Sequence, residues 1–378
     1  MARTIAKSLL ITHLSILPDP RMEINRKHLL IDILMITVCA VLAGAHGWED
    51  IENWGIEKEK WLRKFLKLPF GIPCHDVFRD LFMRLHPEEF GKAFLSWMSS
   101  VRKRTKGEII PLDGKTMRRS FDRASGKTPF HLVSAWASDN GLVLGQMAVD
   151  GKSNEITAIP RLLELLDIND CIVTIDAMGC QTEIAKKIVD LNGDYVLAVK
   201  DNQPKLHEEL KDFFDFAEKA KFADLKYEVF QTVEKDHGRI ETRTYYLVAD
   251  LDWLSVRSKW ANLNSVGMVV SNRQERGKPA TEERRYYINT IEKGVRRFAK
   301  AVRSHWHVEN KLHWTLDVTF NEDQSRKRKD HSAVNFALVL KAALNLLRGI
   351  QAKGDSIRSL RLRAGWNTEV IEKAVFGA

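Results

Sequence analysis

Two aspartates each close a buried strand predicted from the sequence. Residues 108–114 (EIIPLDG) read as a short apolar strand ending at Asp113, and residues 171–177 (CIVTIDA) read as one ending at Asp176. If the two strands lie side by side, both carboxylates reach one edge of the sheet, where active sites of α/β proteins form. Carboxylate oxygens suit Mg²⁺ or Mn²⁺, and paired ions of this kind support in-line phosphodiester chemistry. A turn at Asp113 and a helix cap at Asp176 are the plainer interpretations.

A third acid, Glu309, lies in a later segment with helical periodicity. The residues expected to share one helical face with it are mostly apolar: Val302, Trp306, Glu309, Leu312 and Leu316. A lone carboxylate inside an apolar stripe is costly to bury, so Glu309 should have a partner, and a metal ion is one candidate. An ion pair with Arg303 or a contact with His305 on the same helix is the alternative.

The order of elements predicts the scaffold that positions these acids. Residues 1–100 read as an N-terminal helical domain, and the basic segment 101–108 reads as a linker. The next elements, up to residue 204, follow the order β-β-β-α-β-α-β, which predicts a mixed α/β domain with a leading hairpin and parallel strands after it. Residues 205–290 read as a mostly β insertion. Helical periodicity returns over 291–378 and includes Glu309.

Composition narrows the class of protein. The chain of 378 residues carries a net charge of +9, which favours a polyanionic partner but does not require one. Its four cysteines include no C-x-x-C spacing, so we expect a reduced, cytoplasmic protein. The apolar stretch at 29–45 could span a membrane. However, it is short for a span and is interrupted by Asp32, so we expect a buried core helix and no membrane partner.

Several strings of this sequence resemble one family. They are LDGKTMRRS (112–120), TIDAMGCQ (174–181), YVLAVKDNQPKL (195–206), DHGRIETR (236–243) and SHWHVENKLHWTLDVTFNEDQSR (304–326). Together they resemble DDE insertion-sequence transposases, in particular the H-repeat-associated group. The N-terminal strings DPRMEINRKHLLIDIL (19–34) and GIPCHDVF (71–78) resemble the helical region that precedes the catalytic domain in that group.

The resemblance implies a fold, a site and a reaction. The fold would be an RNase-H-like mixed sheet flanked by helices, with the β-rich insertion between the last core strand and the Glu-bearing helix. The catalytic, metal-binding residues would be Asp113, Asp176 and Glu309, holding two Mg²⁺ or Mn²⁺ ions. The partners would be double-stranded DNA, both transposon terminal repeats and target, with a homodimer in the active complex.

The chain departs from the wider family pattern around Glu309. Related transposases carry an Arg, a Lys and a Tyr at fixed helical steps, where this chain has His305, Leu316 and Val302. Trp306 does match an expected aromatic residue. DNA contacts inferred from that pattern therefore stay open here.

Candidate DNA-contacting residues fall in four groups. They are Lys115, Arg118 and Arg119 after the first aspartate; Lys200, Asn202 and Gln203 past a core strand; His237, Arg239 and Arg243 on one face of a strand; and His305, Trp306 and Lys311 around Glu309. The alternatives are a solvated basic surface for the first group and a helix-capping turn at Asn202 for the second. For the strand, the alternative is a polar outer face with Glu241 paired between its arginines.

The sequence thus predicts a DNA transposase that cleaves transposon ends and transfers them into target DNA. Two other functions remain open. One is a metal-dependent nuclease on the same fold, which would cut DNA without joining it. The other is a catalytically decayed, DNA-binding relic of a transposase.

Overall fold

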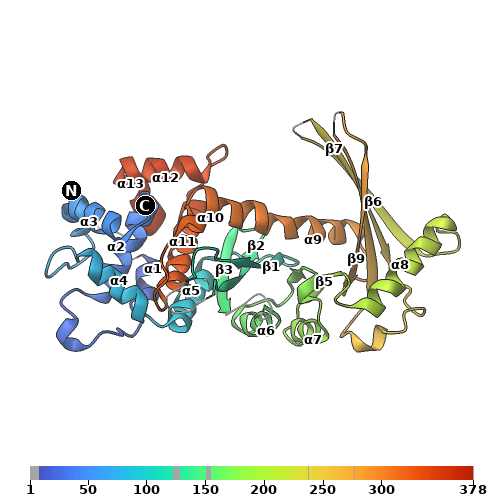
Figure 1. Cartoon of the computed structure of the whole chain (residues 1–378), viewed down its shortest axis with the longest axis horizontal. Helices are drawn as coiled ribbons and strands as arrows, with labels where there is room; N and C mark the ends of the chain where they lie inside the picture. The colour runs from blue at the N-terminus through green and yellow to red at the C-terminus, as the bar shows by residue number, and fades with distance from the viewer. Residues whose placement is uncertain (1–7, 122–127, 150–154, 237, 276, 378) are drawn as a thin grey trace.

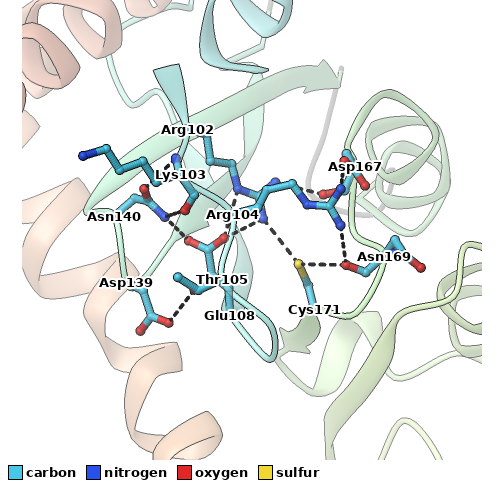
Figure 2. Close-up of polar contacts among 10 residues, drawn as sticks. All are labelled: Arg102, Lys103, Arg104, Thr105, Glu108, Asp139, Asn140, Asp167, Asn169 and Cys171. Carbon is cyan, nitrogen blue, oxygen red and sulfur yellow. Dashed lines mark hydrogen bonds and ion pairs between the residues drawn. The ribbon is translucent and has the colours of Figure 1, made fainter. Parts of the chain in front are cut away.

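The computed structural model describes residues 8–121, 128–149, 155–236, 238–275 and 277–377. Helices from both ends of the chain form one end of the molecule (Figure 1). Their bounds are α1 (Leu9–Leu14), α2 (Leu30–Leu42), α3 (Trp48–Leu62), α4 (His75–Arg84), α5 (Pro87–Val101), α11 (Ser332–Gly349), α12 (Ile357–Trp366) and α13 (Thr368–Phe376). Apolar residues of the early and late helices share a single hydrophobic core.

Helix α2 is the apolar stretch singled out in the sequence, and it is a core helix. All but its first two residues are buried, including Asp32. Burial raises the pKa of Asp32, although one of its carboxylate oxygens accepts a hydrogen bond from the Leu68 backbone amide at 2.9 Å. Within the described ranges, no helix combines the length and apolarity needed to cross a bilayer.

In the part of the chain that the structure describes, nine strands form one mixed sheet. Its order is β3-β2-β1-β4-β5-β9-β8-β7-β6. The bounds are β1 (Ile109–Thr116), β2 (His131–Ala137), β3 (Leu142–Val149), β4 (Ile172–Ile175), β5 (Asp194–Val199), β6 (Tyr227–Asp236), β7 (Arg239–Val248), β8 (Ser265–Glu275) and β9 (Thr281–Asn289).

The first five strands have the RNase-H-like arrangement that was predicted. Strands β1, β2 and β3 pair antiparallel, whereas β4 runs parallel to β1 and β5 runs parallel to β4. Helices α6 (Glu155–Leu165) and α7 (Thr182–Asp190) pack on one face, against Ile110 and Val173. Helix α9 (Val295–His307) covers the opposite face, where Phe298 meets Ile109 and Ile172 (Figure 1). Side chains alternate between the two faces because the strand period is two.

The β-rich insertion is confirmed, and it extends the central sheet. Strand β9 pairs antiparallel with β5, and β8, β7 and β6 follow outward as further antiparallel strands. Helix α8 (Pro204–Lys219) packs against this part through Phe214, whose ring stacks with that of Tyr286. This helix begins at Pro204, because proline fits the first helical position.

The Glu-bearing segment crosses the sheet from the insertion to the helical end of the molecule (Figure 1). It contains α9, then a π-helical turn (Val308–His313), then α10 (Trp314–Val318). The sequence predicted one continuous α-helical stripe, and the structure corrects this. The extra residue per turn changes which side chains face the core after residue 307.

Candidate active site

The ends of two adjacent parallel strands bring the two aspartates together. Strand β1 pairs with β4 in a register that places Leu112 beside Ile175. Asp113 and Asp176 each follow these residues directly, so they occupy equivalent positions where the pairing of β1 with β4 ends. The sequence predicted that the two acids lie side by side, but β1 does not end at Asp113: it continues beside β2 to Thr116.

Asp176 also caps a short 3-10 helix (Ala177–Gly179). One of its oxygens accepts backbone hydrogen bonds from Met178 at 3.1 Å and Gly179 at 3.4 Å. Asp176 therefore caps this helix and also lies at the candidate site. The loop that follows is held from β5's side, because the Asn202 amide donates to the Ala177 carbonyl at 2.6 Å.

Glu309 lies on the π-helical turn, and its side chain is exposed while Leu312 is fully buried. Val302, Leu312 and Leu316 of the predicted stripe are buried, but the placement of Glu309 within that stripe is wrong, because the π turn rotates the glutamate out of the core. In the described ranges no cation forms an ion pair with Glu309. Arg303, the alternative partner, pairs instead with Glu234 at 2.8 Å.

His305 lies among the three acids. Its Nδ1 is 3.1 Å from the Thr174 hydroxyl on β4. Burial lowers the pKa of His305, and the negative charges of Asp113, Asp176 and Glu309 oppose that shift without reversing it. The imidazole thus joins the Glu-bearing helix to strand β4 through its contact with Thr174.

Asp113 is engaged by His313, four residues after Glu309. The distance from His313 Nε2 to the Asp113 carboxylate is 3.2 Å. Burial alone would raise the pKa of Asp113, but the hydrogen bond and charge of His313, with the charge of His305, hold it below its usual value. Asp113 is therefore a carboxylate, and it faces the same helix that carries Glu309.

A cavity of about 420 Å³ opens beside these residues. Asp176, Glu309 and Thr174 line it, together with Lys200 and Trp306. Its rim also includes Arg285, whose guanidinium carbon lies 5.0 Å from the centre of the Trp306 ring. Such a contact combines cation and aromatic surface in a way that suits a nucleotide strand.

The acids are near one another without forming a closed metal cage. Asp113 is not among the residues that line the cavity. Across the residues that the structure describes, no group of three or more His, Cys, Asp or Glu side chains is placed closely enough to hold a metal ion.

The cations after Asp113 divide into two kinds. Lys115 is only 13% exposed, and its ammonium contacts Asp317, Glu322 at 2.9 Å and Asp323 at 3.4 Å. It is thus committed to carboxylates within the fold and does not present its charge to DNA. Arg118 is exposed and Arg119 is half-buried.

The group past β5 is also divided. Lys200 is exposed at the cavity. Asn202 and Gln203 instead turn their amides inward, and that of Gln203 donates to the Cys180 carbonyl at 2.9 Å. Asn202 does not cap α8, whose N-cap residue is Gln203 without a side-chain cap bond. Both amides position the loop after Asp176.

The predicted cationic strand is a paired polar face. Glu241 lies between two arginines, 3.6 Å from Arg239 and 2.5 Å from Arg243. This is the alternative that the sequence left open. His237 lies outside the described residues. Near Glu309, Lys311 is exposed, and burial and the charge of Arg348 lower its pKa.

Sequence reasoning missed two residues that line the cavity. Thr174 lies inside a predicted strand, and Arg285 lies in the insertion with no motif around it.

Comparisons with known proteins follow the same division of the chain. A family model described as "Transposase DDE domain" matches residues 104–346, and one described as "DDE_Tnp_1-associated" matches residues 11–98. The chain belongs to the DDE transposase family. "Putative transposase YncI" of Escherichia coli O157:H7 is 41% identical over 97% of this chain and 94% of its own length.

A second relative confirms the group within the family. "H repeat-associated putative transposase YhhI" of Escherichia coli K12 is 37% identical over 98% of both chains. Among solved structures, a piggyBac transposase synaptic complex with hairpin DNA aligns with a TM-score of 0.45 and 10% identity, over 96% of this chain and 76% of that one. That likeness is too weak to support a conclusion about this chain.

Proposed function

We propose that this member of the DDE family is an active transposase, in which Asp113, Asp176 and Glu309 act together on the DNA phosphodiester. The observation that carries the proposal is the unmatched charge of Asp176 and Glu309. Two carboxylates on separate elements line one cavity, and in the described ranges neither forms an ion pair with a cation. Carboxylates that share a cavity and are not paired within the fold suit a cationic ligand, so one is expected there.

The donor set fits hard divalent cations. Carboxylate oxygens are the ligands that Mg²⁺ and Mn²⁺ prefer, and no thiol is among the three residues. Glu309 and Asp176 are open to the cavity, whereas Asp113 would have to exchange its contact with His313 for the metal. When bound, two such ions would supply an activated water and stabilise the leaving oxygen during hydrolysis and strand transfer.

The residues around the acids have supporting roles in this proposal. His305 links the Glu-bearing helix to β4 through its contact with Thr174. Asn202 and Gln203 hold the loop after Asp176. Lys200, Arg285 and Trp306 border the cavity, where a DNA strand bound in the site would pass. A homodimer is proposed for the active complex because two transposon ends must be joined.

The decisive experiment is cleavage of labelled duplexes carrying the element's own terminal repeats. Wild type should cut at the repeat boundary with Mg²⁺ or Mn²⁺ and not with chelator. Asp176→Asn should abolish cutting. Asp201→Asn is the matched control, because Asp201 lines the same cavity but is fully exposed and paired with His207. Equal activity of both variants would reject the assignment of Asp176.

Metal binding can be measured apart from catalysis. Mn²⁺ titration followed by electron paramagnetic resonance should show sites in wild type and Asp201→Asn that are weakened in Asp176→Asn. Unchanged Mn²⁺ binding by the Asp176 variant would contradict the proposed ligand set. If the protein binds the repeats but no metal supports cleavage, a decayed DNA-binding relic is the better function. Cutting without strand transfer into a supercoiled target would favour the nuclease.

A further inference from the structure

A second cavity lies at the seam between the N-terminal helices and the segment that follows α10. Its volume is about 390 Å³. One wall consists of residues 46–48 at the start of α3, and the other includes Phe320, Arg326 and Lys327, with Phe336 of α11. None of the described residues that line it is an aspartate or a glutamate. The lining therefore presents cations and polar groups without a carboxylate among them.

Lys327 occupies the wall of this seam cavity in an uncommon way. Its ammonium nitrogen lies 3.6 Å from the centre of the Phe336 ring and 4.9 Å from that of Trp48, and it donates to the His46 carbonyl at 2.5 Å. No carboxylate forms an ion pair with it within the described ranges. An ammonium has three donors, and the carbonyl uses one of them. Burial lowers the pKa of Lys327 to about 7, against the opposing charge of Asp50.

A run of four cations continues from the cavity to the surface. It is Arg326, Lys327, Arg328 and Lys329. Arg326 and Lys329 are exposed. The Arg328 guanidinium donates to the Arg119 carbonyl at 3.0 Å, which ties the run to the loop that follows the strand of Asp113. Exposed Arg118 lies on that loop, so the cations connect the seam to the neighbourhood of the catalytic strand.

These cations differ from those elsewhere near the site. Lys115, Arg239 and Arg243 are each matched by a carboxylate. For Arg326 and Lys329, the described residues provide no such carboxylate. A cation that the fold does not neutralise is available to an anionic partner, and a row of them suits a polymer of phosphates.

We infer that the seam cavity, with exposed Arg326 and Lys329, holds the sugar–phosphate backbone of DNA beside the catalytic site, one phosphate being seated against Lys327. The inference rests on the proposed function, because it takes DNA as the substrate. It adds a contact surface that joins the N-terminal helices to the catalytic part of the chain. A bound phosphate oxygen would accept the remaining ammonium donors of Lys327 and keep that side chain charged.

The test is the salt dependence of DNA binding, measured with chelator present so that no cleavage occurs. Fluorescence anisotropy of a labelled terminal-repeat duplex would be recorded from about 50 to about 200 mM salt, a range over which phosphate contacts change affinity strongly. The double variant Arg326→Ala/Lys329→Ala should flatten the slope of log K against log salt by about 2, or roughly 0.9 per lost contact. Its affinity should fall at least about tenfold.

The matched control is Lys60→Ala/Lys64→Ala, which removes two exposed lysines at the far end of α3 from the cavity. It should keep the wild-type slope. Lys327→Met retains the apolar contact with Trp48 and Phe336 but removes the charge, and should flatten the slope by about 1. Lys327→Arg should restore it. Thermal melts report whether each variant folds. If Lys327→Met does not fold, the inference is tested by Arg326→Ala/Lys329→Ala, which changes exposed residues only.

Two outcomes would overturn the inference. One is an unchanged slope in the folded double variant. The other is protection of wild type by inorganic phosphate, lost in Lys327→Met, with no change in DNA binding, because the cavity would then serve a small anion. Failure of the catalytic proposal is distinguishable. A protein that never cuts DNA, yet loses binding in the double variant and not in the control, supports this surface and rejects only catalysis.

Discussion

Carboxylates beside the two parts of the central sheet differ in whether they form ion pairs. In the β6–β9 part, Glu234 is paired with Arg243 at 3.0 Å and Arg303 at 2.8 Å, and Glu241 with Arg239 and Arg243. In the β1–β5 part, Asp176 and Glu309 line a cavity, and the described chain offers no cation paired with either.

The carboxylates of the β6–β9 part are paired within the fold, whereas Asp176 and Glu309 are free to bind a ligand in the proposed function. Burial would raise the pKa of Glu234, but the hydrogen bonds and charges of Arg243 and Arg303 lower it, so that acid is neutralised internally. The three acids have histidines as neighbours instead: His305 lies near all of them, and His313 contacts Asp113. Internal pairing stabilises a sheet extension, whereas an unmatched pair of acids carries a cost that a metal ion would remove.

The largest expected effect comes from removing an unmatched charge. Glu309→Gln should reduce DNA cleavage by at least about a thousandfold, since a metal-ligand charge is lost. It should leave the free energy of unfolding within about 0.5 kcal/mol of wild type or raise it, because the side chain is exposed and no cation among the described residues pairs with it. Rates in single-turnover assays and urea denaturation would check both. A large loss of stability would show that Glu309 is structural.

A substitution at Gly114, next to Asp113, should have the second-largest effect, because it should lower the stability of the fold. A Cβ atom at Gly114 would collide with the side chains of His131 and Glu155, which are buried and in contact with each other. We expect Gly114→Ala to cost about 1–3 kcal/mol and to slow cleavage by displacing Asp113. Gly91→Ala is the control, because nothing lies within 4 Å of its added methyl group in α5, and it should stabilise slightly. Equal stabilities would contradict this.

Breaking a matched pair should affect folding more than chemistry. Arg243→Met leaves Glu234 and Glu241 without their shared, largely buried partner, which is 11% exposed. The expected cost is about 1–3 kcal/mol, the usual effect of removing a partner from a buried polar group. Cleavage per folded molecule should change less than about threefold. If Arg243→Met lost as much cleavage activity as Glu309→Gln and kept normal stability, the proposed difference between the two parts of the sheet would be contradicted.

The smallest effect concerns pH. The pKa of Asp113 is lowered in the folded chain because His313 and His305 outweigh burial. Its ionised form therefore contributes stability above the usual carboxyl value of about 3.8, and that contribution is lost as pH falls through the lower folded value. Denaturation of wild type and Asp113→Asn should differ by a constant amount above about pH 5 and converge below about pH 4. A difference that grows on acidification would refute the assigned direction.

Much of the scaffold was predictable because its patterns are local. The strands that carry Asp113 and Asp176 have continuous apolar runs, and the helices after them have clear periodicity. The same local patterns predicted the β-rich insertion and the buried helix around Asp32. The domain boundaries at residues 100, 204 and 290 stay predictions, and so do the catalytic roles and the homodimer.

Predictions of charged contacts were less reliable, since the sequence does not show which cation meets which acid. Lys115 lies two residues after Asp113 and looked available to DNA, but its ammonium contacts Asp317, Glu322 and Asp323, which lie far away in the sequence. Asn202 and Gln203 looked like surface residues and instead hold a loop. Arg239 and Arg243 were predicted to contact DNA, and only the alternative, a polar face with Glu241 between the two arginines, named their actual partner.

The sequence by itself indicated most element types and the family, and it singled out the three acids as candidates, because each is carried by local periodicity or by strings of neighbouring residues. The tertiary structure decided what surrounds those acids. Glu309 leaves the core because a π turn interrupts the helix, a change too small to alter the sequence pattern. His313 meets Asp113 and Lys327 lies between two aromatic rings because distant segments pack there, and such contacts depend on the whole fold rather than on spacing along the chain.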